Sequence, residues 1–204
     1  EETRRYVVPS APGKRHSGDT KVTDLLYKCY GQAILDDDRE EDFEEILKVI
    51  KDRYDSIING LELTISLDDE FKTIQENFSK KIGRDYAASR GEYLNGIIMA
   101  AYLGYEFIDA AEVIFFDEEG EFDAEKTNEV LSERLAHTER AVIPGFYGSN
   151  PDGTIHTFSR GGSDITGSIV ARAVHADMYE NWTDVSGFLI ADPRIIKNPK
   201  AIDV

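Results

Sequence analysis

The peptide RAVIPGFYGSNPDGTIHTFSRGGSDITGSIVARAVHA, residues 140–176, carries the clearest signal of fold class. Residues 140–144 form an apolar run of strand length that a proline and a glycine bring to an end. A long polar loop follows, and residues 166–176 have the small-residue packing face of a helix. A strand, a glycine-bearing loop and a helix in this order are typical of α/β proteins.

The same alternation continues on the N-terminal side of this peptide. Apolar runs at 105–109 and 113–116 indicate strands, and periodic segments at 85–103 and 124–137 indicate helices. Gly104 directly follows the first of these helices and is expected to end it. The sequence therefore predicts an α/β sandwich with a largely parallel sheet.

The rest of the chain adds elements without suggesting a domain boundary. We expect a short strand at 6–8, a polar loop at 10–20, a helix at 21–34, a second helix whose solvated start is the acidic run 36–45, mostly helix at 61–80, and short strands at 177–182 and 187–190. The sequence has no internal repeat and no linker-like segment. One domain over residues 1–204 is the prediction.

Charge and cysteine usage exclude several classes of partner. The chain has 204 residues and a formal net charge of −17, so its surface repels a phosphate backbone and an anionic membrane alike. We expect no nucleic-acid or membrane partner, and no run of about 18 apolar residues occurs. The single cysteine, Cys29, cannot form an internal disulfide, which fits a reducing compartment, the cytoplasm.

The sequence Ser159-Arg-Gly-Gly-Ser-Asp164 is the first candidate site. Adjacent glycines let a ligand approach the backbone closely, and the following helix N-terminus favours an anion. Arg160 offers a guanidinium fork for a carboxylate, and Asp164 can cap the helix or organise cations around a phosphoryl group. An ordinary glycine turn capped by Ser163 or Asp164 explains the spacing equally well.

Two further clusters are candidates. Glu92 lies in an apolar helix, where a buried carboxylate needs a partner and could bind an ammonium group. Burial statistics alone favour an exposed helical glutamate instead. The polar segments 181–187 and 191–194 follow a strand candidate, where open α/β sheets place ligands, and Trp182 is expected in the core.

Taken together, these motifs resemble those of the aspartokinases. RGGSD at 160–164 with Thr166, WTDVSG at 182–187 and DPR at 192–194 match the family's pattern and order. SRGE at 89–92, PGFYGS at 144–149 and VVPSAPG at 7–13 fit as well. The resemblance implies the amino-acid kinase fold (carbamate kinase-like), a three-layer α/β/α sandwich with a mainly parallel sheet, here incomplete at both ends.

The resemblance also implies an activity and a set of site residues. The catalytic domain would transfer the γ-phosphate of ATP to the β-carboxylate of L-aspartate, giving 4-phospho-L-aspartate on the route to lysine, threonine and methionine. Arg160 would bind a substrate carboxylate and Glu92 the α-ammonium group, while Asp164 would organise the charged catalytic groups. The remaining aspartate-pocket residues would be Thr23, Gly145, Phe146 and Ser163. The nucleotide would lie against Ser10, Gly162, Thr183, Asp184, Leu189 and Arg194, with Leu189 where an aromatic residue often stands beside the adenine.

Substrate and cofactor chemistry agree with these roles. The β-carboxylate of aspartate is already ionised at pH 7, so no general base is required. Positioning and charge neutralisation remain, with Mg²⁺ supplied alongside ATP. The four histidines show no metal-ligand spacing and are expected to be structural or surface residues; they are His16, His137, His156 and His175.

The sequence departs from the family pattern at both ends. The family begins with a strand and a lysine-bearing glycine loop and continues past this point into a second nucleotide-site lysine and ACT domains, and neither segment is in these 204 residues. We expect these residues alone to be inactive and the full-length enzyme to be a homo-oligomer through its ACT domains. Two alternatives stay open: a related kinase of glutamate or acetylglutamate, and a non-catalytic ligand-binding fragment.

Overall fold

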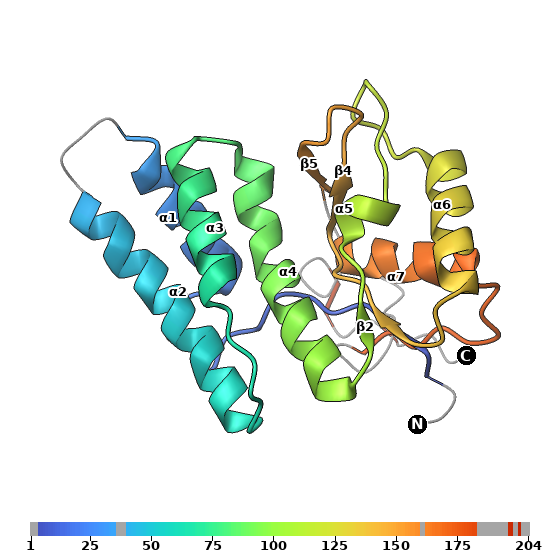
Figure 1. Ribbon diagram of the computed structural model, residues 1–204, viewed down its shortest axis with the longest axis horizontal. Coiled ribbons are helices and arrows are strands. Elements are labelled where there is room, and N and C mark those ends of the chain that lie inside the picture. Colours follow the sequence, from blue (N-terminus) through green and yellow to red (C-terminus); the bar gives the residue numbers. More distant parts are fainter. Residues whose placement is uncertain (1–3, 36–39, 160–161, 183–195, 198–199, 201–204) are drawn as a thin grey trace.

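The computed structural model describes residues 4–35, 40–159, 162–182, 196–197 and 200. Figure 1 shows two halves side by side: helices α1–α4 form the helical half, and the strands with α5–α7 form the sheet half. The elements are β1 (Tyr6–Val7), α1 (Val22–Ala33), α2 (Glu40–Gly60), α3 (Asp68–Ser79), α4 (Arg84–Leu103), β2 (Glu106–Phe107), α5 (Ala110–Val113), α6 (Ala124–Ala136), β3 (Ala141–Val142), β4 (Tyr147–Ser149), β5 (Ile155–Thr157) and α7 (Gly162–Ala173).

Strands β1, β3 and β2 form a parallel sheet in that order. Ala141 of the central strand pairs with Tyr6 on one side and with Glu106 on the other. Both residues of β3 are buried, as expected for a strand covered on both faces. The predicted α/β class with a parallel sheet is confirmed.

Helices cover both faces of this sheet. Helix α4 packs on one face, where Gly96 lies so close that an added Cβ would be 2.8 Å from Pro144 Cγ and 3.0 Å from Phe107 Cε2. On the other face, apolar residues of α6 and α7 share a core with β3, among them Leu131 and Val170. The three-layer α/β/α arrangement follows.

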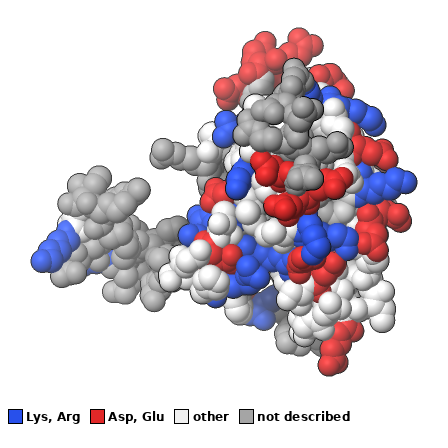
Figure 2. Space-filling model, turned by 90° about the vertical axis from the view of Figure 1, so that its left-hand side faces the viewer, with Lys and Arg blue, Asp and Glu red and all other residues white. Residues whose placement is uncertain are grey.

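The helical half has a core of its own, which joins α1–α4. Its largest fully buried side chains include Leu26, Tyr54 and Phe78, and Tyr30 meets Phe78 edge to face at 5.3 Å between ring centroids. Figure 2 views the molecule from the side of this half and shows acidic and basic side chains intermixed on its surface. Pairs one helical turn apart, such as Lys48–Asp52 at 2.6 Å, account for part of this mixture and stabilise little when exposed.

The helix predictions agree best with the structure where the apolar periodicity extends over many residues. The helices expected at 21–34, 85–103 and 124–137 are confirmed within one or two residues at each end. Gly104 ends α4 as expected, in the left-handed conformation with φ 68°. No helix among the described residues is both long and apolar enough to cross a membrane.

Several short elements were predicted wrongly. The strand expected at 113–116 is the end of α5 followed by two single bridges, because the Asp109 carboxylate caps a helical turn there. The segment 61–80 is mostly helical as expected, because α3 covers Asp68–Ser79, but residues 61–67 are not helical. The long loop expected before α7 contains the antiparallel hairpin β4–β5, and α7 begins at Gly162 rather than at residue 166.

The C-terminal predictions differ in outcome. Residues 177–182 are not a strand, and residues 187–190 lie outside the described residues. Trp182 is not a core residue: it is 80% exposed, and the Arg4 guanidinium lies 5.5 Å from the centre of its ring. Stacking against a surface cation gives an indole a stable position without burial.

Candidate functional site

Six of the predicted site residues line one cavity of about 240 Å³. They come from four separate segments: the loop after β1, helix α4, the entry to β4 and the start of α7. The residues are Ser10, Glu92, Phe146, Gly162, Ser163 and Asp164. The fold therefore brings together side chains that are up to 154 positions apart, between residues 10 and 164.

Close backbone packing fixes the entry to β4 against the start of α7. A Cβ added to Gly162 would lie 2.7 Å from Phe146 Cα, and one added to Gly145 would lie 2.7 Å from Ser163 Cα. Neither position has room for a side chain. The glycines are required by this contact, which places Gly145 directly behind Ser163 rather than in the cavity.

Hydrogen bonds hold the same junction. The Phe146 backbone N–H donates to Thr166 Oγ1 at 3.1 Å, and that hydroxyl donates to the Gly162 carbonyl at 2.8 Å. Phe146 has a φ of 82°, a conformation that costs a non-glycine residue on the order of 1–3 kcal/mol. Strain of this kind is typical of ligand sites, where the surrounding structure holds it in place.

The loop after β1 is held against α4. Asn95 donates from Nδ2 to the Ser10 carbonyl at 2.7 Å. An added Cβ at Gly91 would lie 2.9 Å from Ala11 Cβ, so the glycine allows this close approach. Tyr54 of α2 donates from its hydroxyl to the Gly91 carbonyl at 2.7 Å, which ties the second helix to the same place.

An ion-pair cluster closes the far end of that loop. The Asp19 carboxylate pairs with Arg53 at 3.1 Å and accepts hydrogen bonds from Arg15, which hold the pKa of Asp19 well below its usual range. Arg53 is buried and also donates to the backbone carbonyls of Gly13 and Thr20. Sequence reasoning assigned no role to Arg53, although an arginine on the apolar side of an amphipathic helix is a usable signal.

Glu92 is buried, contrary to the exposed position that burial statistics favoured. Its side chain sits in the stretch of α4 that lies between the two halves, and the residue is 7% exposed. Burial raises the pKa of Glu92 to about 7, while hydrogen bonding to the Ala11 backbone and the charge of Arg90 act in the opposite direction. Its Oε2 has no hydrogen-bond partner among the described residues.

A buried carboxylate oxygen without a partner, in the wall of a cavity, is a binding group for a cation or a hydrogen-bond donor. Opposite it stands the first turn of α7, whose free backbone N–H groups favour negative charge. Asp164, in that turn, is exposed. The cavity thus offers an acceptor for a positive group on one wall and an anion-binding helix end on the other.

The other predicted site residues have different outcomes. Thr23 is half-buried near the start of α1 and does not line the cavity. Arg160, Thr183, Asp184, Leu189 and Arg194 lie outside the described residues. The convergence of Arg160 with Glu92, on which the sequence interpretation depends, therefore stays a prediction.

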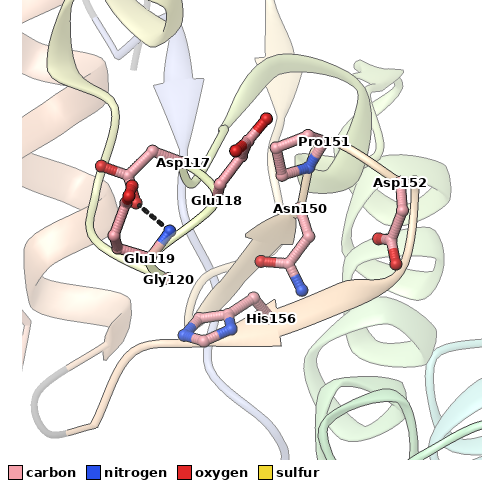
Figure 3. A pocket seen from close by; sticks show the side chains of 8 residues that line it. All are labelled: Asp117, Glu118, Glu119, Gly120, Asn150, Pro151, Asp152 and His156. Carbon is pink, nitrogen blue, oxygen red and sulfur yellow. Dashed lines mark hydrogen bonds between the residues drawn. The ribbon is translucent and has the colours of Figure 1, made fainter.

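A larger cavity of about 510 Å³ lies between the 117–120 turn and the β4–β5 hairpin (Figure 3). Four of its lining residues are acidic: Asp117, Glu118, Glu119 and Asp152. Among the described residues neither arginine nor lysine lines it, so its four carboxylates would repel an anionic substrate. The smaller cavity around Glu92 is the better candidate site despite its size.

Comparison with known proteins places this geometry in context. A model of the amino acid kinase family matches residues 6–204. Aspartokinase 3 of Bacillus subtilis (strain 168) is 37% identical over 214 residues, which is 98% of this chain and 46% of the relative. Aspartokinase of Rickettsia conorii is 28% identical over 87% of this chain and 48% of its own length.

Solved structures give the same picture. Aspartate kinase of Clostridium acetobutylicum matches with a TM-score of 0.86 and 51% identity, over 98% of this chain and 45% of that one. Aspartokinase III of E. coli, in complex with aspartate and ADP, matches with a TM-score of 0.76 and 25% identity, over 98% and 46%. The chain spans about half the length of the relatives it matches.

Proposed function

The chain belongs to the amino acid kinase family, and we propose that it is the catalytic domain of an aspartate kinase. The reaction transfers the γ-phosphate of ATP to the β-carboxylate of L-aspartate and yields 4-phospho-L-aspartate. The similarity to aspartokinases over 98% of the chain supports this choice. The observation that carries it is the buried carboxylate of Glu92, whose Oε2 has no hydrogen-bond partner among the described residues, in a cavity lined by five other residues of the predicted site.

The cavity suits one end of a zwitterionic dicarboxylic acid. Glu92 binds the α-ammonium group, which supplies the missing partner of its Oε2. Ser163 and Phe146 line the same space, and Gly145 lies behind Ser163. Thr23 is part of the proposed aspartate pocket by resemblance alone, because it does not line the cavity. Arg160 precedes Gly162 by two residues in the sequence, and in this proposal its guanidinium binds a substrate carboxylate.

We place the nucleotide on the other side of the cavity. Ser10 and Gly162 line it, and the first turn of α7 provides backbone N–H groups for phosphate oxygens. Thr183, Asp184, Leu189 and Arg194 complete the nucleotide site in this proposal. Asp164, one of two described acidic residues that line the cavity, would lie beside Mg²⁺ bound with ATP, and the ion would supply charge neutralisation at the phosphate oxygens.

The chemistry asks little of the protein beyond positioning. The attacking β-carboxylate is ionised at neutral pH, so no residue has to remove a proton. Arg160 and Asp164 act by fixing the reacting groups and the charges around them in line. The close-packed, hydrogen-bonded junction between β4 and α7 suits this purpose, because Phe146, Gly162 and Ser163, which line the cavity, belong to it.

The wider setting is part of the proposal. The chain supplies the catalytic domain of a longer cytoplasmic enzyme, whose glycine-loop lysine and ACT domains lie outside these residues and whose ACT domains pair subunits into a homo-oligomer. Neither nucleic acid nor a membrane is a partner, consistent with the net charge of −17. The product leads toward lysine, threonine and methionine.

Steady-state kinetics of the full-length protein test the proposal. ATP turnover is measured with aspartate, glutamate and N-acetylglutamate as acceptors, and we expect turnover with aspartate. The Glu92→Gln variant should raise the KM for aspartate about 10- to 100-fold, the loss of one charged hydrogen bond, with little change in the KM for ATP. Glu76→Gln, an exposed glutamate on α3, is the matched control.

Two results would contradict the assignment. Turnover with glutamate or N-acetylglutamate but not with aspartate would assign the chain to a related kinase. Calorimetric binding of aspartate without any binding of ADP would favour a non-catalytic ligand-binding module.

A further inference from the structure

Arg90 is a buried arginine that the proposed reaction leaves without a role. It lies on α4, two residues before Glu92, and is 5% exposed. Its Nε and Nη2 both donate to the Ser89 hydroxyl, at 3.1 and 3.0 Å, and Ser89 donates in turn to the Tyr86 carbonyl. Arg90 forms no ion pair with a carboxylate in the described part of the chain. A buried guanidinium without such a partner requires another form of stabilisation.

Three tyrosine rings provide that stabilisation. The Arg90 Cζ lies 4.2 Å from the ring centre of Tyr93, 4.5 Å from that of Tyr86 and 5.4 Å from that of Tyr147. A desolvated cation is attracted electrostatically to the negative face of an aromatic ring. The planar guanidinium can meet several such faces at once, which an ammonium group does less well.

Two of these tyrosines also donate hydrogen bonds to carboxylates. Tyr147 donates to Asp109 Oδ1 at 2.7 Å, and Tyr93 donates to Glu70 Oε2 at 3.0 Å. The positive charge of Arg90 is therefore balanced at a distance, through hydroxyl groups. The resulting cluster joins α3, α4, α5 and β4 around one buried cation.

The cluster lies directly behind two walls of the proposed aspartate pocket. Tyr147 follows Phe146, which lines the cavity, and Arg90 precedes Glu92 on the helix that forms the opposite wall. A guanidinium held between α4 and β4 therefore fixes how far apart Glu92 and Phe146 stand.

We propose that Arg90 is a positioning residue for the aspartate pocket: its caged guanidinium fixes α4 against β4, and its buried charge favours the ionised, ammonium-binding form of Glu92. This inference rests on the proposed function, because it assigns Arg90 to the same reaction. The charge of Arg90 lowers the pKa of Glu92 against the larger effect of burial. The other described groups at Glu92 are Tyr54 of α2, the Ala11 backbone and Asp164 of α7.

The pH dependence of the KM for aspartate separates this role from plain packing. With a Glu92 pKa of about 7, half of the enzyme has the ionised carboxylate at pH 7. If a neutral residue at 90 raises that pKa by about one pH unit, about one molecule in eleven is ionised at pH 7, so the KM rises about fivefold. At pH 9 the KM values of the wild type and the neutral variant should differ by only about 1.1-fold.

The neutral variants are Arg90→Met and Arg90→Gln. Arg90→Gln keeps an amide donor for Ser89, and either variant alone is sufficient for the test. Arg90→Lys retains the charge and should restore the wild-type pH profile. Arg84→Met removes another arginine of α4, exposed and stacked on Tyr27 at 4.5 Å, and is the matched control. The proposal would be overturned if the KM for aspartate increased equally at pH 7 and pH 9 in the neutral variants and Arg90→Lys did not restore it. Arg90 would then act through packing alone.

A second readout does not depend on turnover. In protein with ¹³C-labelled glutamate, the carboxyl resonance of Glu92, assigned by its loss in Glu92→Gln, should titrate about one pH unit higher in the neutral variants than in Arg90→Lys. If the wild type fails to use aspartate while this difference appears, the proposed function fails and the electrostatic role of Arg90 stands. An unchanged titration in the neutral variants contradicts the role of Arg90 whatever the substrate.

Discussion

The buried carboxylate of Glu92 lowers the stability of the folded protein, and the proposed function gives the same carboxylate a binding role. Glu92 is 7% exposed, and its Oε2 has no hydrogen-bond partner among the described residues, so burial of the charged carboxylate costs folding free energy. Its folded-state pKa of about 7 stands above the ordinary value of 4.5 for the same reason. In the proposed function, the same charge binds the α-ammonium group of aspartate.

The pH dependence of stability tests this cost of burial. Because the pKa of Glu92 is raised in the folded state, the folded protein holds the proton more tightly than the unfolded chain between pH 4.5 and about 7. Stability therefore falls as the pH rises through that window, by up to about 3 kcal/mol from this one group. Glu92→Gln should match the wild type near pH 4.5 and exceed it by up to that amount at pH 8.

Urea denaturation at both pH values measures the difference. Glu76→Gln, on the exposed face of α3, serves as the control and should show no such gain at pH 8. A Glu92→Gln variant that is less stable than the wild type at pH 8 would mean that the carboxylate has a partner in the folded protein, and the ammonium-binding role would lose its basis.

At the scale of elements, the site depends on the contact between the entry to β4 and the start of α7. Gly162 begins α7, and there is no space for a methyl group beside the Phe146 backbone. The strained Phe146 is held there by Thr166. A change at Gly162 must therefore move two walls of the cavity relative to each other.

We expect Gly162→Ala to lower kcat/KM for aspartate about 100-fold, since a shift of about 1 Å in a reacting group has that effect. Gly31→Ala is the matched control: Gly31 lies in α1 with nothing within 4 Å of an added Cβ, so alanine should add about 0.5–1 kcal/mol of stability and leave kinetics unchanged. Wild-type kinetics in Gly162→Ala would show that the junction does not position the substrates.

The same elements show what the sequence could and could not predict. Helices such as α4 and α6 were predictable because many turns repeat one apolar face. The hairpin β4–β5 was not, because each strand has three residues and the pairing is decided by a turn and by packing on α4. Likewise the apolar run at 113–116 looked like a strand, although the cap at Asp109 makes its start helical.

The candidate site residues came from the resemblance to the aspartokinases, since the glycine pair and Glu92 alone are explained equally well or better by ordinary structural roles. Six of these residues line one cavity, while their functional roles stay predictions. The burial of Glu92 and the cage around Arg90 could not be predicted, because both arise only where α4 lies between two halves of the molecule. Periodicity along one helix contains no information about what stands on its other side.

At the scale of the whole molecule, two hydrophobic cores meet at α4. One core joins α1–α4 and the other joins the sheet with α5–α7, and Tyr93 of α4 packs against both. The cavity lies at this boundary, with Glu92 on the shared helix and Phe146, Ser163 and Asp164 on the sheet half. The distance between the two halves therefore sets the width of the pocket.

Gly96→Ala tests this dependence far from the substrates. The added methyl group would lie 2.8 Å from the ring of Pro144 and 3.0 Å from Phe107, so α4 must move away from the sheet. Overpacking of this kind costs about 1–3 kcal/mol, of which alanine returns up to about 1 kcal/mol through its helix propensity. Gly60→Ala, at the end of α2 with nothing within 4 Å, is the control and should be neutral or stabilising.

Denaturant midpoints and the KM for aspartate are measured on both variants. We expect Gly96→Ala to lower the midpoint at an unchanged denaturant slope and to raise the KM several-fold, because Glu92 follows the helix outward while Phe146 stays with the sheet half. A loss of stability with an unchanged KM would show that the two halves separate without widening the pocket. The site would then depend on the β4–α7 junction alone, and not on the meeting of the two cores.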